Sequence, residues 1–196
     1  MRGMIDPNPP PKPSFDRPAD PAILPSPWVL RWAPLIQAGG SVLDVAAGHG
    51  RHARALAQQG FRVTAVDLDV TGLKDPSDPP FEVVAADLEG GTWPLAGRVF
   101  AGIVVTNYLH RPHFPHLVAS LSPGGVLIFE TFGQGNERVG RPRNPDFLLA
   151  PGELLTAFSP HLQIVAYEHG AAQSPRPAVR QRLCAIKSEM PAALYP

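Results

Sequence analysis

The stretch from residue 42 to residue 51 constrains the fold of this chain more than any other. The run from Val42 to Val45, rich in β-branched valine, predicts a buried strand, and Gly48 and Gly50 follow one residue apart. Apolar residues then recur at helical spacing from Arg51. A strand, a glycine turn and a helix in this order predict a ligand site. Glycine lets a ligand approach the backbone, and the start of a helix offers free N–H groups.

Composition excludes several classes of protein. A chain of 196 residues suits one α/β domain, and its formal net charge of zero argues against a large footprint for duplex nucleic acid. The single cysteine, Cys184, excludes an internal disulfide framework and a multi-cysteine zinc site, and we expect no metal. The chain has neither an apolar run of membrane-spanning length nor a signal-peptide core, so we expect a cytoplasmic protein without a membrane partner.

Proline content sets the expected domain boundaries. Residues 1–25 are proline-rich and predict an extended arm, with a motif for a proline-recognising partner as the alternative. Ser26 and Pro27 are typical of a helix start, and the paired glycines at 39–40 end that segment. We therefore expect one domain over residues 26–187 and a tail over residues 188–196.

Further strands end in polar residues that belong at the same rim. Strands are predicted at 61–66, 81–85, 99–106 and 126–132, and at 162–168 and 178–186 near the C-terminus. Asp67 follows the second strand, where a carboxylate accepts hydrogen bonds from ribose hydroxyls in nucleotide-binding folds. Asp87 follows the third strand, where it can accept from an adenine amino group while Leu88 packs on the ring.

These motifs together resemble those of class I S-adenosylmethionine-dependent methyltransferases. The resemblance rests on residues 42–51, 66–67 and 86–88, and on the Leu-Ser-Pro-Gly-Gly turn at 121–125. Within the class, the chain is similar to small bacterial methyltransferases of the tellurite-resistance type. One departure is Ala46-Ala47, where the family often has a further glycine, so we expect a slightly tighter pocket.

The resemblance implies a single-domain α/β fold with a doubly wound, Rossmann-like sheet of seven strands. The sheet is expected to be mostly parallel, with an antiparallel last strand. The implied cofactor is S-adenosylmethionine, and S-adenosylhomocysteine is the product. The residues expected to bind the cofactor are Asp44, Ala46, Gly48, Gly50, Asp67, Leu68, Asp87, Leu88 and Asn107.

Two further segments are candidates for the acceptor and for catalysis. Tyr108 and His110 follow the fourth strand and are the expected catalytic residues, with His113 as a further candidate base. Residues 133–150 are longer than a connection in this fold requires and follow the fifth strand on the ligand side. A small, anionic acceptor is expected there, because the loop carries Arg138 and the four substrate-binding candidates, Asn136, Glu137, Arg141 and Arg143.

Two other functions stay open at this point. One is a nicotinamide-dependent oxidoreductase, since the glycine pattern also fits dinucleotide-binding proteins, although a second half-domain for the nicotinamide is missing. The other is a catalytically silent, methyltransferase-like binding protein. The acceptor could also be RNA, and the oligomeric state stays open.

Overall fold

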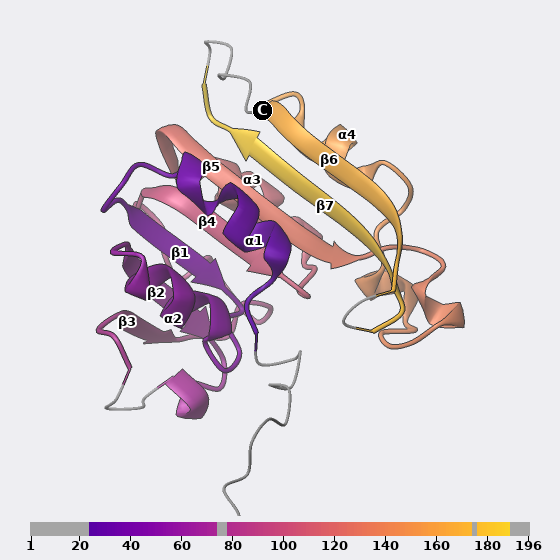
Figure 1. The fold of residues 1–196 in the computed structure, drawn as a ribbon, viewed down its shortest axis with the longest axis horizontal. Coiled ribbons are helices and arrows are strands. Elements are labelled where there is room, and N and C mark those ends of the chain that lie inside the picture. The colour runs from indigo at the N-terminus through magenta and orange to yellow at the C-terminus, as the bar shows by residue number, and fades with distance from the viewer. Residues whose placement is uncertain (1–23, 74–77, 174–175, 189–196) are drawn as a thin grey trace, which may run out of the picture.

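One mixed β-sheet organises the computed structural model, which describes residues 24–73, 78–173 and 176–188 (Figure 1). The order of the seven strands in these residues is β3-β2-β1-β4-β5-β7-β6. Most of the predicted proline-rich arm, part of the proline-rich segment after residue 73 and nearly all of the predicted tail lie outside the described residues. The strands are β1 (Ser41–Val45), β2 (Arg62–Asp67), β3 (Glu82–Ala85), β4 (Phe100–Thr106), β5 (Leu121–Phe132), β6 (Gln163–Ala172) and β7 (Ala178–Ile186).

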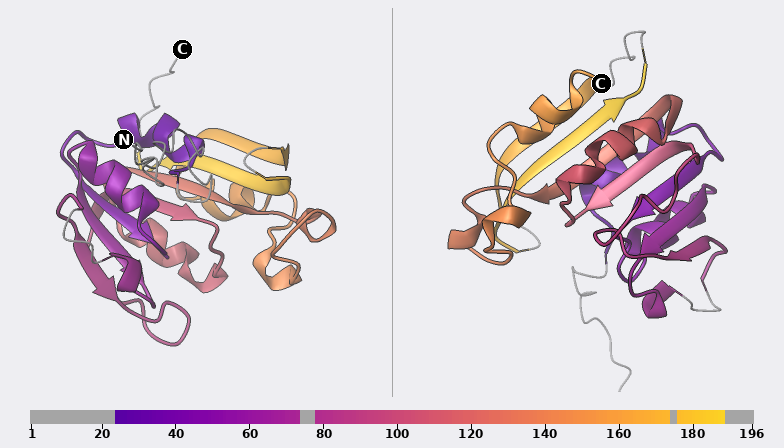
Figure 2. Two further views of the ribbon diagram at one scale, coloured as in Figure 1. Left: turned by 60° about the horizontal axis from the view of Figure 1, so that its bottom comes forward. Right: turned by 180° about the vertical axis from the view of Figure 1, so that it is seen from behind.

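Helices cover both faces of the sheet. Figure 1 shows α1 (Pro27–Trp32) and α2 (Arg51–Gln58) in front of it, and the rear view in Figure 2 shows α3 (Phe114–Ala119) and α4 (Glu153–Phe158) on the other face. Helix α1 begins as predicted, because the Ser26 hydroxyl accepts from the backbone N–H of Trp28. The short 3-10 helices are η1 (Ala33–Leu35), η2 (Thr71–Leu73), η3 (Arg111–His113), η4 (Asn136–Arg138) and η5 (Pro145–Phe147).

Strand alternation explains why this sheet has two cores. Val42 packs into the core under α1 and α2, whereas its neighbour Leu43 packs into the core under α3 and α4. Leu127 and Ile128 of β5 divide in the same way. Successive side chains of a strand point to opposite faces, so a strand covered on both faces is expected to be mostly apolar. This accounts for the continuous apolar runs that predicted the central strands.

Strand direction decides which residues meet at the functional edge. Strands β1 to β5 pair in parallel, while β7 runs antiparallel to both β5 and β6. The predicted fold class is therefore confirmed. Because β7 is reversed, its first residues lie beside the last residues of β5, with Arg180 opposite Phe132.

The structure differs from the predicted boundaries mainly at β5. The Pro-Gly-Gly segment was expected to precede this strand, but β5 already begins at Leu121, which pairs with Phe100. The glycines form an irregularity inside the strand, where the register shifts and Gly124 N–H bonds the carbonyl of Lys187 at 2.7 Å. Within the described residues, no helix is long and apolar enough to cross a membrane.

Candidate active site

The glycine turn joins β1 to α2 in an unusual backbone conformation. Ala46, Gly48 and Gly50 have φ angles of 53°, 57° and 75°, a region that favours glycine. A Cβ on Gly50 would lie 2.6 Å from the Leu73 side chain, so this position is closed by packing. A Cβ on Gly48 would meet nothing within 4 Å. Gly48 therefore borders open space, as expected of a residue beside which a ligand lies.

Asp67, at the end of β2, braces the same turn. Its Oδ2 accepts from the Gly48 N–H at 2.7 Å, and its Oδ1 accepts from the Asp69 N–H at 3.1 Å. Carboxylate oxygens each accept more than one hydrogen bond, so both oxygens can still accept from a ligand. This half-buried side chain thus combines a structural role with the capacity to bind hydroxyl groups.

Asp44, in β1, is a buried carboxyl group with an unsatisfied oxygen. It is 1% exposed, and its Oδ2 accepts from the Ala53 N–H at 3.0 Å. Its Oδ1 is buried and has no partner among the described residues. Burial raises the pKa of Asp44 to about 7, and the hydrogen bond from Ala53 offsets part of that effect. A buried acceptor of this kind suits a ligand that donates a hydrogen bond.

The residues after β3 and β2 form the side expected to hold adenine. Asp87 is exposed, and its Oδ1 accepts from the N–H groups of Glu89 and Gly90 at 2.8 and 3.0 Å. Leu88 is 6% exposed and belongs to the core under α3 and α4. Leu68 is 71% exposed, so its side chain is available at the surface.

Two expected site residues follow β4. Asn107 has a φ of 55° and accepts a hydrogen bond at its Oδ1 from Arg180 Nη1 at 2.8 Å. The Tyr108 hydroxyl is buried without a partner among the described residues. Burial raises the pKa of Tyr108, and the negative charges of Glu89 and Asp87 raise it further. Tyr108 therefore remains a neutral phenol that faces the acidic side of the site.

His110 lies in a cluster of histidines. Its ring is 4.5 Å from that of His113, which in turn lies 4.9 Å from the Trp93 ring. His113 is 5% exposed, and its Nε2 contacts the carbonyl of Leu88. Tyr108 lines the large cavity described below, whereas His110 and His113 do not. Of the expected catalytic pair, only Tyr108 thus lines the cavity, while His110 packs against His113, which contacts Leu88 and Trp93.

The loop of residues 133–150 is shaped by its own polar side chains. Asn136 is 0% exposed, donates to the carbonyl of Pro142 at 3.1 Å and accepts from the Val179 N–H at 3.1 Å. Glu137 accepts from the Gly135 N–H at 2.7 Å. Both side chains act on the backbone of the loop and of β7, so they set the shape of this wall.

The expected arginines of this loop differ in position. Arg141 and Arg143 are both exposed, but only Arg141 lines the cavity. Arg111 of η3 holds the end of the loop, because it donates to the carbonyls of Asp146 and Leu148 and pairs with Glu153 at 2.5 Å.

A cavity of about 1410 Å³ opens between the glycine turn, the end of β4, the loop and the start of β7. Its described lining residues include no aspartate or glutamate. They include five arginines, in a chain whose formal net charge is zero. Arg54 pairs with Asp78 at 2.5 Å and Arg180 with Glu130 at 3.3 Å, so two of these charges are partly balanced, and the excess of arginines along the lining favours an anion. These arginines are Arg51, Arg54, Arg141, Arg176 and Arg180.

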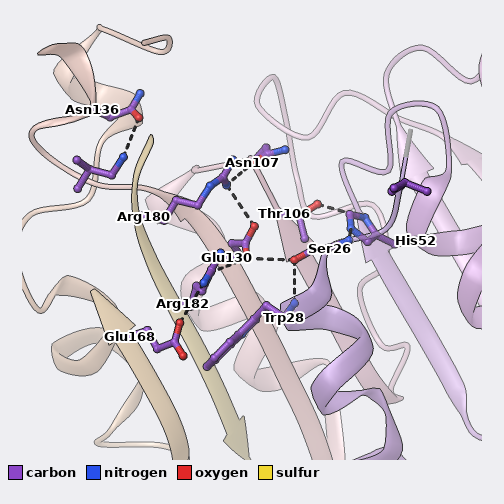
Figure 3. Close-up of polar contacts among 12 residues, drawn as sticks. Ser26, Trp28, His52, Thr106, Asn107, Glu130, Asn136, Glu168, Arg180 and Arg182 are labelled. Atoms are coloured by element: carbon purple, nitrogen blue, oxygen red, sulfur yellow. Dashed lines mark hydrogen bonds and ion pairs between the residues drawn. The ribbon is translucent and has the colours of Figure 1, made fainter. Parts of the chain in front are cut away.

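A buried ionic network holds Arg180, which lines this cavity (Figure 3). Glu130, in β5, is 5% exposed. Its Oε2 accepts from the Ser26 hydroxyl at 3.1 Å and from Arg182 Nε at 2.7 Å. Its Oε1 accepts from Arg180 Nη1 at 3.3 Å. Arg182 also donates to Glu168 at 3.0 Å, so one buried carboxylate is shared between two arginines.

His52, in α2, connects the glycine turn to the ionic network through Ser26. It is 1% exposed, and its Nε2 accepts from the Ser26 backbone N–H at 3.1 Å. Nδ1 therefore carries the proton and donates to the Thr106 hydroxyl at 3.3 Å. Burial, aided by the charge of Arg51, lowers the pKa of His52 to about 3. His52 is thus a neutral structural residue.

Comparison with known proteins identifies the family. A protein-family model described as a methyltransferase domain matches residues 21–169, which is most of the chain. The chain belongs to this methyltransferase family. No curated protein matches it. The methyltransferase uses S-adenosylmethionine, and one similar structure, the glycopeptide N-methyltransferase MtfA, holds S-adenosylhomocysteine.

Solved structures share the fold at low sequence identity. TehB from Haemophilus influenzae is 18% identical with a TM-score of 0.68, and the alignment covers 81% of this chain but only 61% of TehB. The 1,6-didemethyltoxoflavin-N1-methyltransferase of Burkholderia thailandensis is 19% identical with a TM-score of 0.62, over 87% and 80% of the two chains. NodS, an N-methyltransferase of Bradyrhizobium japonicum, is 20% identical with a TM-score of 0.59, over 82% and 94%.

The methyltransferase has residues that fit S-adenosylmethionine at the edge where the parallel strands end. Gly48 borders open space, and Asp44 Oδ1, which has no partner among the described residues, is left as an acceptor for a donor group. The cofactor carries an ammonium group, two ribose hydroxyls and an adenine amino group, all of which are donors. A row of carboxylates at the ends of β1, β2 and β3 therefore suits it.

The sequence alone missed His52, Glu130, Arg180 and Arg182 of this methyltransferase. A signal for three of them was present. Glu130 interrupts an apolar strand, and Arg180 and Arg182 are two charges on one face of a strand that lies inside the sheet. Charged residues in such strands need a partner or a ligand, so pairing of Glu130 with these arginines was predictable in principle.

Proposed function

We propose that this methyltransferase transfers the methyl group of S-adenosylmethionine to a small, negatively charged acceptor bound in the arginine-lined cavity. The observation that carries this proposal is the composition of the cavity, in which five arginines and no described carboxylate line the wall. An anion at this position gains charge-assisted hydrogen bonds, whereas a cation is repelled.

The cofactor lies, in this proposal, along the ends of β1, β2 and β3. Asp67 binds the ribose hydroxyls, and Asp87 with Leu88 binds adenine, near exposed Leu68. Asp44 accepts from a donor group of the cofactor. The small residues Ala46, Gly48 and Gly50 leave room for it, and Asn107 borders it at the end of β4. Support comes from the acceptor oxygens that these aspartates present.

The protein's part in the transfer is to position the acceptor and to exclude water. The bound cofactor supplies an activated methyl group and a good leaving group. Tyr108 lines the cavity and stays protonated, so we assign it a hydrogen bond that orients the acceptor. His110 supports the adenine side through His113, which contacts the carbonyl of Leu88.

The loop of residues 133–150 forms the acceptor side. Arg141 contacts the acceptor, because it lines the cavity. Asn136 and Glu137 hold the loop in shape, through the bonds to Pro142, Val179 and Gly135. Arg143 adds to the positive potential from outside the cavity. The family match gives no support to the oxidoreductase alternative.

A methyl-transfer screen tests the proposal. Wild-type protein and cofactor with a labelled methyl group are incubated with matched pools of small carboxylates, phosphorylated metabolites, their neutral counterparts and RNA. Labelling confined to anionic small molecules supports the proposal. Labelling of neutral compounds or of RNA contradicts the acceptor class, and no transfer to any pool by protein that binds S-adenosylhomocysteine favours a silent binding protein.

The loop arginines refine this test once an acceptor is found. Arg141→Ala is expected to raise the Michaelis constant of the acceptor by about tenfold or more, because a desolvated charged contact is lost. Arg143→Ala should have a smaller effect, since its charge acts through solvent. Equal effects of the two substitutions would place the acceptor at the outer surface of the loop instead.

A further inference from the structure

Arg180 lies in a strand, β7, that is not adjacent to β1, the strand that leads into the glycine turn. It lies near the start of β7, opposite Phe132 at the end of β5. Strands β4 and β5 separate β7 from β1. At a spacing of about 4.8 Å between neighbouring strands, the two backbones are roughly 14 Å apart. Arg180 therefore lines the cavity from the side opposite the glycine turn.

Three contacts hold the Arg180 guanidinium in place. Its Nη1 donates to Asn107 Oδ1 at 2.8 Å and to Glu130 Oε1 at 3.3 Å, as Figure 3 shows. The guanidinium carbon lies 4.4 Å from the centre of the Phe132 ring. Both hydrogen bonds use the same nitrogen, so neither engages the other guanidinium nitrogens. These neighbours thus fix the guanidinium, and neither hydrogen bond uses Nε or Nη2.

The charge on Arg180 is poorly balanced. Arg182 makes the shorter contact with Glu130, 2.7 Å against 3.3 Å, and also pairs with Glu168. Arg180 therefore shares a carboxylate that is already engaged. Its side chain is 15% exposed, and burial with the nearby charges of Arg182 and Arg51 lowers its pKa. A partly buried cation that is short of negative charge stabilises an anion brought beside it.

We propose that Arg180 binds a carboxylate or phosphate group of the acceptor, with Arg141 and Arg176 at the rim of the same cavity. This inference rests on the proposed function and names the residue that selects the substrate. The planar fork of arginine matches both anions in a bidentate manner.

The bound anionic group anchors the acceptor molecule, and a different atom of that molecule receives the methyl group. Methylation of an oxygen would remove the negative charge that the guanidinium stabilises, so the arginine would oppose the transfer. An anion that keeps its charge throughout the reaction keeps its interaction with the guanidinium. The acceptor therefore has at least two functional groups, an anionic one on Arg180 and a separate nucleophile near Tyr108.

Anion titrations test the role of Arg180 without knowledge of the acceptor. Benzoate and inorganic phosphate are titrated at constant ionic strength into protein saturated with S-adenosylhomocysteine, and binding is followed by calorimetry. Wild type should bind one of the two anions, and Arg180→Gln should weaken that binding by about tenfold or more. Arg180→Lys should recover only part of it, because lysine lacks the fork. Arg62→Gln is the matched control, since Arg62 is exposed at the start of β2.

The cofactor's own carboxylate is the competing anion, and a second titration separates the two. Affinity for S-adenosylhomocysteine should change less than about twofold in Arg180→Gln, as should affinity for 5′-methylthioadenosine, which lacks the amino acid group. Loss of affinity for S-adenosylhomocysteine alone would show that Arg180 binds the cofactor, which overturns the proposal. Unchanged anion binding in Arg180→Gln, or no anion binding to wild type, would overturn it as well.

A different set of binding results would show that the proposed function is wrong while the anion site is correct. The anion titration is repeated on protein without S-adenosylhomocysteine, where an effect of Arg180→Gln still supports the anion site. Wild-type protein that binds the anion but not S-adenosylhomocysteine would count against the methyltransferase assignment alone. Thermal unfolding of each variant shows whether it is folded, and Glu130 keeps its pair with Arg182 in Arg180→Gln.

Discussion

The two halves of the functional edge present different polar side chains. At the ends of β1, β2 and β3, the polar side chains are carboxylates, namely Asp44, Asp67 and Asp87. Arg51 and Arg54 of α2 line the cavity beside the glycine turn, and beyond it Arg141, Arg176 and Arg180 come from the loop after β5 and from the segment that starts β7. We call these the acidic half and the basic half. In the proposed function, this difference lets one edge of the sheet offer hydrogen-bond acceptors to the cofactor and hydrogen-bond donors to the acceptor molecule.

The two halves are also built differently. Asp44 lies in β1, Asp67 is the last residue of β2 and Asp87 comes two residues after β3, so each aspartate is placed by a strand close to it in the sequence. Arg180 depends on Glu130, Asn107 and Phe132, which lie between 48 and 73 residues away along the chain. The acidic half is therefore a local structure, while the basic half requires the complete sheet.

The largest expected effect comes from removing the carboxylate inside the basic half. Glu130→Ala leaves Arg180 and Arg182 close together without a shared partner and removes the acceptor of the Ser26 hydroxyl. The free energy of unfolding should fall by about 3–5 kcal/mol, as for other broken buried ion pairs. Denaturation in urea measures it.

An exposed ion pair is the control for Glu130→Ala. Glu82 pairs with Arg98 at 2.6 Å, but the two side chains are 50% and 40% exposed. Glu82→Ala should therefore cost less than about 1 kcal/mol. Equal losses for the two substitutions would mean that Glu130 is not a structural centre of the basic half.

Two buried residues with opposite pH dependence provide the next test. Folding lowers the pKa of His52 to about 3 and raises the pKa of Asp44 to about 7. Between about pH 4 and pH 6.5, the unfolded chain binds a proton at His52 that the folded chain lacks, so acidification destabilises the fold. At Asp44 the folded chain holds the extra proton, so acidification stabilises it. In wild type the two effects largely cancel.

Single substitutions should remove this cancellation. In Asp44→Asn, acidification from pH 6.5 to about 4.5 should lower the free energy of unfolding, relative to wild type, by about 1.4 kcal/mol per pH unit. In His52→Gln, the free energy of unfolding should instead fall as pH rises through the same window, by a similar slope. Urea denaturation at three pH values decides, and slopes equal to that of wild type would contradict both assignments.

A side chain in the open space of the glycine turn should break the acidic half without unfolding it. Gly48→Val places a branched group where no atom lies within 4 Å. Affinity for S-adenosylhomocysteine should fall at least about a hundredfold, or ~2.7 kcal/mol. Gly60→Val is the control, because Gly60 also has a positive φ and open surroundings but lies at the end of α2. Similar affinity in the two variants would move the cofactor away from this turn.

The smallest expected effect concerns the ribose. Asp67→Ala removes acceptors for two hydroxyls and also the brace on the Gly48 N–H. Affinity for S-adenosylhomocysteine should fall about tenfold, or ~1.4 kcal/mol, by titration calorimetry. Asp69→Ala, in which only a surface contact with Thr71 is lost, should change it less than about twofold. A larger loss at Asp69 would assign the ribose to the wrong carboxylate.

The acidic half was more predictable from the sequence than the basic half. The sheet, its two covered faces and the positions of Asp44, Asp67 and Asp87 follow from apolar runs and the polar residues that end them. The role of Asn136 did not, because its amide bonds the backbone of residues 142 and 179, and no local pattern indicates such pairing. His110 was expected to be catalytic, but it is not among the residues that line the cavity, and its ring packs against that of His113.

The reversed direction of β7 has a consequence for how substrate preference can change. The connection from β6 to β7 ends in Arg176 and Pro177, which line the cavity a few residues before Arg180 in the sequence. Substitutions or insertions in this connection would alter the rim of the cavity while β1 to β3 keep their packing. Grafting the corresponding connection from another member of the family is therefore a route to a new acceptor on an unchanged cofactor platform.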